Sequence, residues 1–192
     1  MLISRDRERL QNAMIFFAGK ANVLSKSKLF RLLYLLDFEH FRRTGRSVTG
    51  SAYEAGEMGP VPVDVARAWD DPRSDLREAI QFVKTVGHRP FVREKDVRQA
   101  FDDSHFTHRQ LTLLRDLTSK YHDACHPDFQ EVAVAENGAF AKTWRDGAGS
   151  HQMIPYELAL SNDDPHVDEI RAAAKEASFI ARRSRHARGE SA

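Results

Sequence analysis

The segment YHDACHP contains the residues best suited to hold a metal ion. His122, Cys125 and His126 have the spacing i, i+3 and i+4, which on a helix places two imidazoles and a thiolate on one face, as a zinc site requires. Asp123 follows the first histidine, where zinc proteases carry a glutamate as general base. Pro127 favours a helix end at this point, so these are equally well ordinary helix-end residues. We expect no bound metal and no cofactor.

Other catalytic patterns do not occur in the sequence. The glycines between Asp146 and Ser150 lack the Lys-Ser/Thr pair of a phosphate-binding loop, and there is no Gly-x-Ser-x-Gly elbow. Cys125 has only the adjacent His126 to activate it as a nucleophile. We therefore expect no catalytic residues and no enzymatic activity, and we keep a metal-dependent hydrolase as the least favoured alternative.

The run ARRSRHAR near the C-terminus concentrates positive charge in the four arginines Arg182, Arg183, Arg185 and Arg188. Such a run can contact the phosphates of DNA, or it can be a solvated, frayed end. It has no interleaved aromatic residues to stack on single-stranded nucleic acid. A DNA-binding transcriptional regulator that uses this tail is the second function that the sequence leaves open.

The composition is that of an ordinary globular protein. The chain has 192 residues, 41% of them hydrophobic, and a net charge of +1, which gives no general attraction to nucleic acid or anionic lipid. The single cysteine excludes an internal disulfide, and no apolar run approaches the ~20 residues that span a bilayer. We expect a cytoplasmic protein without membrane insertion.

The hydrophobic pattern predicts the elements that must position these residues. We expect a mainly α fold with a small antiparallel β-hairpin (α+β), in a single compact helical domain. Residues 1–163 would form its main part, and residues 164–192 a C-terminal helix with a basic frayed tail in the same domain. The predicted helices cover 4–19, 24–45, 63–69, a stretch that begins at Ser104 or Thr107 and runs through Tyr121, 128–136, and a last one from 165. The predicted hairpin covers 79–95.

The helix over 24–45 is apolar on nearly every side and is expected at the centre of the domain. It is followed by the segment EAGEMGPVPV, which begins at Glu54. Gly56 and Gly59 permit unusual backbone angles there, while Pro60 and Pro62 fix the path of the chain. We expect a rigid turn that either serves only as a structural junction or also lies near a partner-binding surface.

The stretch KLFRLLYLLDFEHFRRTGRSVTGSAYEAGEMGPVPVDV resembles the characteristic half of the Panacea domain of the SocA-like antitoxin family. The residues that carry this resemblance are Lys28, Leu29, Leu32, Leu33, Tyr34, Asp37, Thr44, Gly45, Tyr53, Gly59, Pro60, Val61 and Pro62. A second, weaker landmark is carried by Lys142, Thr143, Trp144, Gly149, Ile154 and Pro155. Altogether the resemblance extends from about Ala13 to Leu160.

One stretch departs from the family pattern. Where members commonly carry a Ser/Thr-His pair and a Pro-Trp, this chain has VAENGAF, with Ala135, Glu136, Ala139 and Phe140. No role of the family residues is carried over to these positions.

The resemblance implies a non-enzymatic bacterial or phage antitoxin of a toxin–antitoxin system, which neutralises a cognate protein toxin by direct binding. A related adaptor function, in which a Clp-type protease degrades the bound toxin, is a second mechanism, and homo-oligomerisation is left open. We hypothesise that the partner-binding residues are Tyr53, Glu57, Met58, Gly59, Pro60, Val61 and Trp69. Trp and Tyr are enriched at the energetic centres of interfaces, although both are also common core residues.

Overall fold

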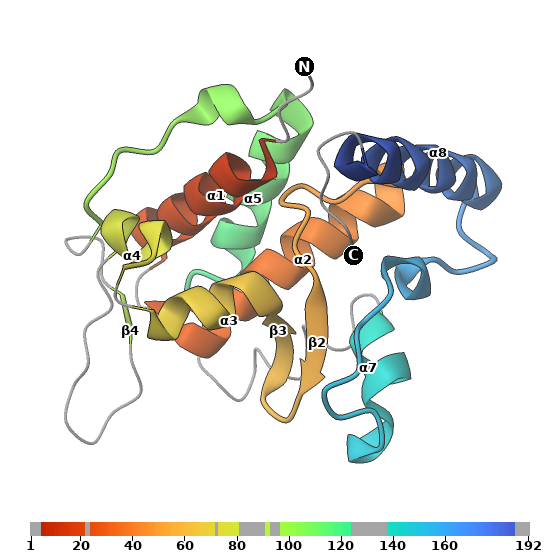
Figure 1. Ribbon diagram of the computed structural model, residues 1–192, viewed down its shortest axis with the longest axis horizontal. Helices are drawn as coiled ribbons and strands as arrows, with labels where there is room; N and C mark the ends of the chain where they lie inside the picture. The colour runs from red at the N-terminus through yellow and green to blue at the C-terminus, as the bar shows by residue number, and fades with distance from the viewer. Residues whose placement is uncertain are drawn as a thin grey trace.

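The structure is a computed structural model that describes residues 5–21, 24–71, 73–80, 91–92, 97–123 and 138–186. The described part is mainly helical with a small β-hairpin, as the sequence predicts (Figure 1). Its α-helices are α1 (Asp6–Lys20), α2 (Lys26–Thr44), α3 (Val63–Asp70), α4 (Asp75–Ala79), α5 (His108–Lys120), α7 (Ala139–Trp144) and α8 (Val167–His186). Short 3-10 helices are η2 (Asp103–His105), η3 (Arg145–Gly147) and η4 (Tyr156–Ala159).

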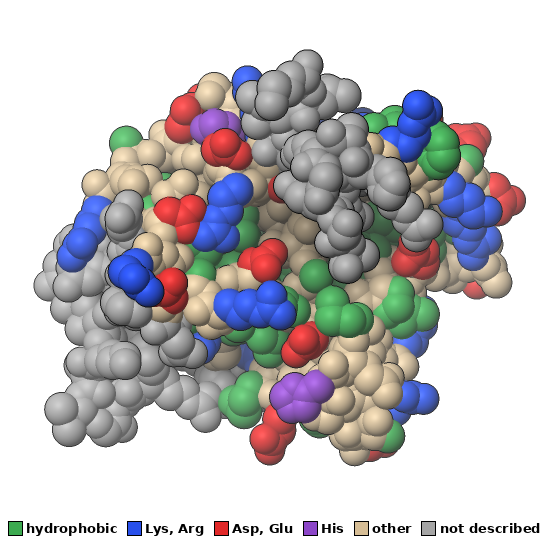
Figure 2. Space-filling view, in the orientation of Figure 1, with side chains coloured by type: hydrophobic (Ala, Val, Ile, Leu, Met, Phe, Trp, Pro, Cys, Tyr) green, Lys and Arg blue, Asp and Glu red, His purple; other side chains and the backbone are tan. Residues whose placement is uncertain are grey.

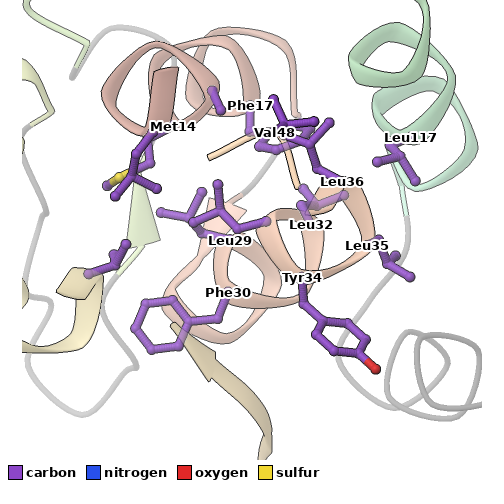
Figure 3. Close-up of a cluster of buried hydrophobic side chains, with 14 of the residues drawn as sticks. Met14, Phe17, Leu29, Phe30, Leu32, Tyr34, Leu35, Leu36, Val48 and Leu117 are labelled. Atoms are coloured by element: carbon purple, nitrogen blue, oxygen red, sulfur yellow. The ribbon is translucent and has the colours of Figure 1, made fainter. Parts of the chain in front are cut away.

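Helix α2 is the centre of the fold, as expected, and every residue from Lys28 to Phe41 is buried. The Ser25 hydroxyl accepts a hydrogen bond from Lys28 N–H and caps its first turn. Gly45, with φ of 70°, ends the helix in the left-handed conformation that glycine adopts without strain. Figure 3 shows the core that results, with side chains of α1, α2 and α5 in one apolar cluster.

Two pairs of antiparallel strands flank α2. Strands β2 (Tyr53–Gly56) and β3 (Gly59–Pro62) form a hairpin, in a segment where the sequence indicated a rigid turn. The hairpin predicted over 79–95 falls largely outside the described residues. Of that segment, β4 (Phe91–Val92) pairs with β1 (Leu24–Ser25), next to the start of α2.

Several predicted helix boundaries need correction. Helix α1 does not stop at Gly19 but includes it and ends at Lys20. Helix α8 continues to His186, so positions 181–186 are helical and not frayed. Thr107 does cap α5, in a reciprocal capping box with Gln110. The helix expected over 128–136 lies outside the described residues.

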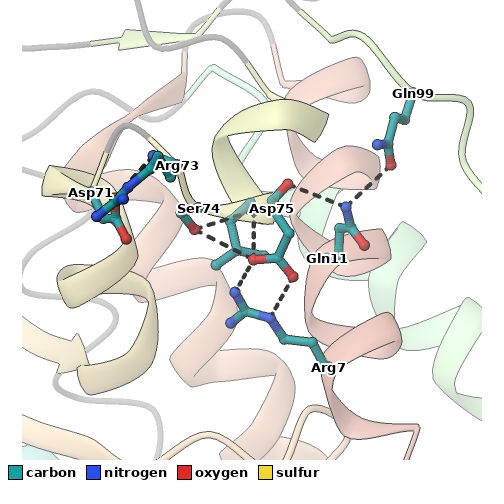
Figure 4. Close-up of polar contacts among 8 residues, drawn as sticks. Arg7, Gln11, Asp71, Arg73, Ser74, Asp75 and Gln99 are labelled. Atoms are coloured by element: carbon teal, nitrogen blue, oxygen red, sulfur yellow. Dashed lines mark hydrogen bonds and ion pairs between the residues drawn. The ribbon is translucent and has the colours of Figure 1, made fainter.

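Helices α1 and α4 are tied together at the surface by a bidentate ion pair (Figure 4). The guanidinium of Arg7 donates from Nε to Asp75 Oδ2 at 2.9 Å and from Nη2 to Asp75 Oδ1. This pairing lowers the pKa of the Asp75 carboxyl, because the guanidinium donates hydrogen bonds to its charged form. The contact fixes the N-terminal helix beside the segment that follows α3.

Among the residues that the structure describes, no helix combines the length and apolar composition needed to cross a membrane.

Candidate functional site

Residues 151–154 lie along one edge of the two-stranded β2–β3 hairpin, and we call the three segments together the ribbon. On the edge of β2 that faces away from β3, Ala55 N–H donates to the carbonyl oxygen of Gln152 (2.8 Å) and His151 N–H donates to that of Ala55 (2.9 Å). Ile154 N–H donates to the carbonyl oxygen of Tyr53 (2.8 Å), so residues 151–154 extend along the whole strand. Both edges of β2 are therefore paired, which makes its backbone a rigid support.

The prolines of β3 lie where they cost no hydrogen bond. Val63 N–H donates to the carbonyl oxygen of Ala52 (2.9 Å), toward β2. Because backbone N–H groups alternate in direction along a strand, positions 60 and 62 face away from β2. Pro60 and Pro62 thus leave the outer edge of β3 without N–H donors at these two positions, which discourages another strand from pairing there. The rigid turn expected from the sequence is a hairpin with a protected edge.

The tip of the hairpin is held to α2 by Arg31, a buried arginine. Its guanidinium donates from Nη2 to the carbonyl oxygen of Met58. Gly59 has a φ of 116°, and a Cβ atom there would lie 3.0 Å from Arg31 Nε. Only glycine satisfies both requirements, the positive φ and the close approach of the guanidinium.

A buried carboxylate holds the other end of the hairpin. Asp37 in α2 accepts hydrogen bonds from the backbone N–H groups of Val48 (2.8 Å) and Thr49 (2.7 Å), from the Thr49 hydroxyl, and from the Tyr53 hydroxyl (2.8 Å). Burial raises the pKa of Asp37, and these hydrogen bonds partly offset that rise. Burial, together with the nearby Asp37 charge, raises the pKa of Tyr53 well above its ordinary value. The network links α2, the 46–51 loop and β2.

The outward side of the ribbon carries the residues that a partner can reach. Glu54 in β2 is paired with Val61 on one side and with Met153 on the other, so these three side chains form a row across the ribbon. Met58 at the tip is 40% exposed and Met153 is 50% exposed. Together with Glu57 we call these residues the hairpin face. Figure 2 shows hydrophobic, acidic and histidine side chains side by side over the hairpin.

The residues proposed for partner binding divide into two groups in the structure. Glu57 and Met58 are exposed and Val61 is half-buried, whereas Tyr53, Gly59, Pro60 and Trp69 are buried. The first group is accessible at the surface, and the second group lies beneath it.

Trp69 belongs to that second group. Its ring packs edge-on against Phe30 at 5.8 Å, and the ammonium of Lys26 lies 5.2 Å from the centre of the indole. These contacts fix α3, which follows directly on β3, against the first turns of α2. Trp69 thus supports the hairpin from the α3 side.

Sequence reasoning missed Glu54 and Met153 as surface residues. Met153 reaches the hairpin only because residues 151–154 pair with β2, and no local pattern indicates that pairing. The sequence around Met153 also contains no periodic pattern that would predict an exposed methionine.

The metal and DNA candidates are only partly within the described residues. Helix α5 ends at Lys120, so His122 lies beyond the helix, where its Nδ1 is 2.8 Å from Asp123 Oδ1. The helical premise of the metal prediction is therefore wrong at His122, while Cys125 and His126 lie outside the described residues. No group of three potential ligands occurs among the residues that were placed.

Of the four arginines considered for DNA binding, Arg183 is exposed on α8, 5.6 Å from the Phe179 ring. Arg182 and Arg185 are in the same helix, and Arg188 lies outside the described residues. The use of these arginines in nucleic-acid binding stays a prediction.

A mainly helical domain that holds one hairpin rigidly against a buried helix has the character of a binding module. The family model for the SocA-like antitoxin, Panacea domain, matches residues 29–137, which is more than half of the chain. The chain therefore belongs to this antitoxin family. The match includes α2 from Leu29 onward and the hairpin, and it ends before the second landmark at Lys142. Comparisons with curated proteins and with solved structures give no match.

Proposed function

We propose that this protein is an antitoxin that neutralises a cognate protein toxin by binding it directly through the hairpin face. Family membership supports an antitoxin with a toxin partner. The observation that carries the choice of surface is the exposure of Met58 and Met153 on a ribbon whose backbone is fixed by Arg31 and Asp37.

The chemistry of the hairpin face indicates what it recognises. Methionine side chains are unbranched and polarisable, so they adapt to an apolar group of a partner. Glu54 and Glu57 flank them with carboxylates, and the histidine nearest to Glu54, His151, is 3.9 Å from it and highly exposed. A toxin segment with an apolar side chain next to a lysine or arginine complements this arrangement.

A rigid surface also favours tight binding. The hairpin loses little conformational entropy on docking, because its edges are paired and its tip is anchored before the partner arrives. Masking the toxin in a stoichiometric complex is then sufficient for neutralisation. Delivery of the bound toxin to a Clp-type protease is a second mechanism that the same surface serves.

The test is co-expression with the product of the adjacent gene. We expect that product to arrest growth when expressed alone, and we expect the antitoxin to restore growth and to co-purify with it. In a strain that lacks the protease, masking predicts full rescue, whereas delivery for degradation predicts that the toxin accumulates and growth stays arrested. Arrested growth with no complex would contradict neutralisation of that neighbour.

DNA binding through α8 is the alternative function. It predicts an affinity that falls steeply with salt and is lost when residues after Ala181 are removed.

A further inference from the structure

Helix α8 packs against the end of α2 along the side that carries Ile170 and Ala174. A Cβ atom on Gly45 would lie 2.5 Å from the carbonyl oxygen of Ile170 and 2.8 Å from Ala174 N, so the two backbones nearly touch at the end of α2. Ile170, Ala174 and Ala177 are half-buried along this contact. The absence of a side chain at Gly45 is what admits the helix so closely.

The apolar stripe of α8 continues beyond this contact into solvent. Ile180 follows Ala173 by seven residues and Ala177 by three, which places it on the same side of the helix. It is nevertheless 43% exposed, and its neighbour Phe179 is 59% exposed. Single exposed apolar residues are ordinary. Here Ile180 prolongs the packed stripe, and the adjacent Phe179, about 100° farther around the helix, is exposed as well, so the two together indicate a contact surface.

We propose that this surface binds a second copy of the chain through an antiparallel pairing of the two α8 helices. A two-fold axis that passes between Phe179 and Ile180 places each phenyl ring against Ile180 of the second copy. Glu176 and Arg183 are equidistant from that axis, about one helical turn away on either side. Each Glu176 then faces Arg183 of the second copy, so the surface is complementary to itself.

The charges exclude the parallel alternative. In a parallel pair, Glu176 would face Glu176 of the second chain and Arg183 would face Arg183. Like charges would then repel at both positions. Both side chains are exposed in the structure, and Arg183 lies over the Phe179 ring, where its charge is next to the apolar centre. In Figure 1, α8 lies at the opposite end of the molecule from the tip of the hairpin. Dimerisation therefore leaves the hairpin face open to a toxin.

The expected dimer is weak and reversible. A contact of two or three helical turns buries less than the ~1,200 Å² typical of stable complexes. Sedimentation velocity on the full-length protein, across a hundredfold range of concentration, should show the average mass rising from the monomer toward twice its value. The variant Phe179→Glu should remain a monomer at every concentration.

A charge exchange tests the antiparallel register itself. Glu176→Arg or Arg183→Glu alone should raise the dimer dissociation constant about tenfold, because each creates two like-charged contacts in the symmetric interface. The double variant with both changes should return to within about threefold of wild type, because the contacts are restored with their signs exchanged. Because both positions are exposed, all three variants should remain folded. Thermal unfolding of each variant checks this.

Three outcomes would overturn the proposal. A wild-type protein that stays monomeric over the whole concentration range has no such interface. A double variant that dimerises no better than the single variants does not have Glu176 and Arg183 facing each other. If Phe179→Glu instead abolished binding of the adjacent-gene product by a monomeric antitoxin, α8 would belong to the toxin interface, which also contradicts self-pairing.

Discussion

Replacing Gly59 with alanine should destabilise the protein strongly, although it adds only one methyl group. Gly59 has a φ of 116°, in a region that residues with a side chain rarely adopt. The added Cβ atom would also lie 3.0 Å from Nε and 3.3 Å from Nη2 of Arg31. Arg31 is buried beneath the hairpin, so its guanidinium cannot move aside without losing its hydrogen bond to Met58.

The two contributions can be given rough magnitudes. The unfavourable backbone conformation costs a non-glycine residue about 1–3 kcal/mol. Overpacking against a buried group adds about 1–3 kcal/mol. Since 1 kcal/mol shifts the melting temperature of a chain of this size by about 2–4 °C, the combined cost of about 2–6 kcal/mol should lower that temperature by roughly 4–24 °C in Gly59→Ala. Differential scanning calorimetry measures the shift directly.

Gly19→Ala is the matched control, because it is the same substitution with the opposite expected sign. Gly19 lies within α1, and a Cβ atom there would have no neighbour within 4 Å. Alanine favours a helix over glycine by up to about 1 kcal/mol, so this variant should melt slightly higher than wild type. Equal stability of the Gly59→Ala variant and wild type would refute the described packing of the hairpin tip on Arg31.

Two further predictions concern the buried polar groups of α2. Asp37→Ala should lower the free energy of unfolding, measured in urea, by about 3–5 kcal/mol, because it leaves two backbone N–H groups and the Tyr53 hydroxyl without their acceptor. Asp37→Asn keeps an acceptor oxygen and should cost less than half as much. Equal costs of the two variants would refute these hydrogen bonds to Asp37. Burial lowers the pKa of His40, so below about pH 6.5 the unfolded chain takes up a proton that the folded protein does not. Wild type should therefore lose stability between pH 7.5 and 5.5, and His40→Asn should reduce that loss; an unchanged slope would contradict it.

Helix α2 could be predicted because every signal that defines it is local. Ser25 caps its start, Gly45 ends it in the left-handed conformation, and the residues between them are apolar on nearly all sides. The family resemblance lies in the same stretch and is confirmed by the family match. Local signals of this kind survive in any tertiary context, so the centre of the fold and the family followed from the sequence.

The hairpin was only partly predictable, because whether Pro60 and Pro62 can lie in a strand depends on the direction in which each backbone position faces. Pro60 and Pro62 indicated a rigid turn, since proline is usually absent from strands. Strand β3 accommodates both prolines because their positions alternate with the positions whose backbone groups bond to β2. That alternation is known only once the register of Tyr53 against Pro62 is known.

Long-range pairings account for what the sequence did not indicate. Strands β1 and β4 have two residues each, which is too short for any periodicity, and they come from distant parts of the chain. The placement of Met153 beside Glu54 likewise depends on contact between remote segments. The surface that a partner meets is assembled from such contacts, so the exposed residues of the candidate site were predictable only in part.

The most direct test of the account is the affinity of the purified antitoxin for the adjacent-gene product, measured by calorimetry with wild type and Met58→Glu. Met58 is exposed, so the substitution should leave the melting temperature unchanged. If the hairpin face is the binding surface, a carboxylate in place of this exposed apolar side chain should weaken binding by at least about 30-fold, which corresponds to about 2 kcal/mol. Phe179→Glu, which introduces the same charge on α8, is the control and should leave the affinity of each chain for the adjacent-gene product unchanged. Equal affinities of wild type and Met58→Glu would contradict binding through the hairpin face.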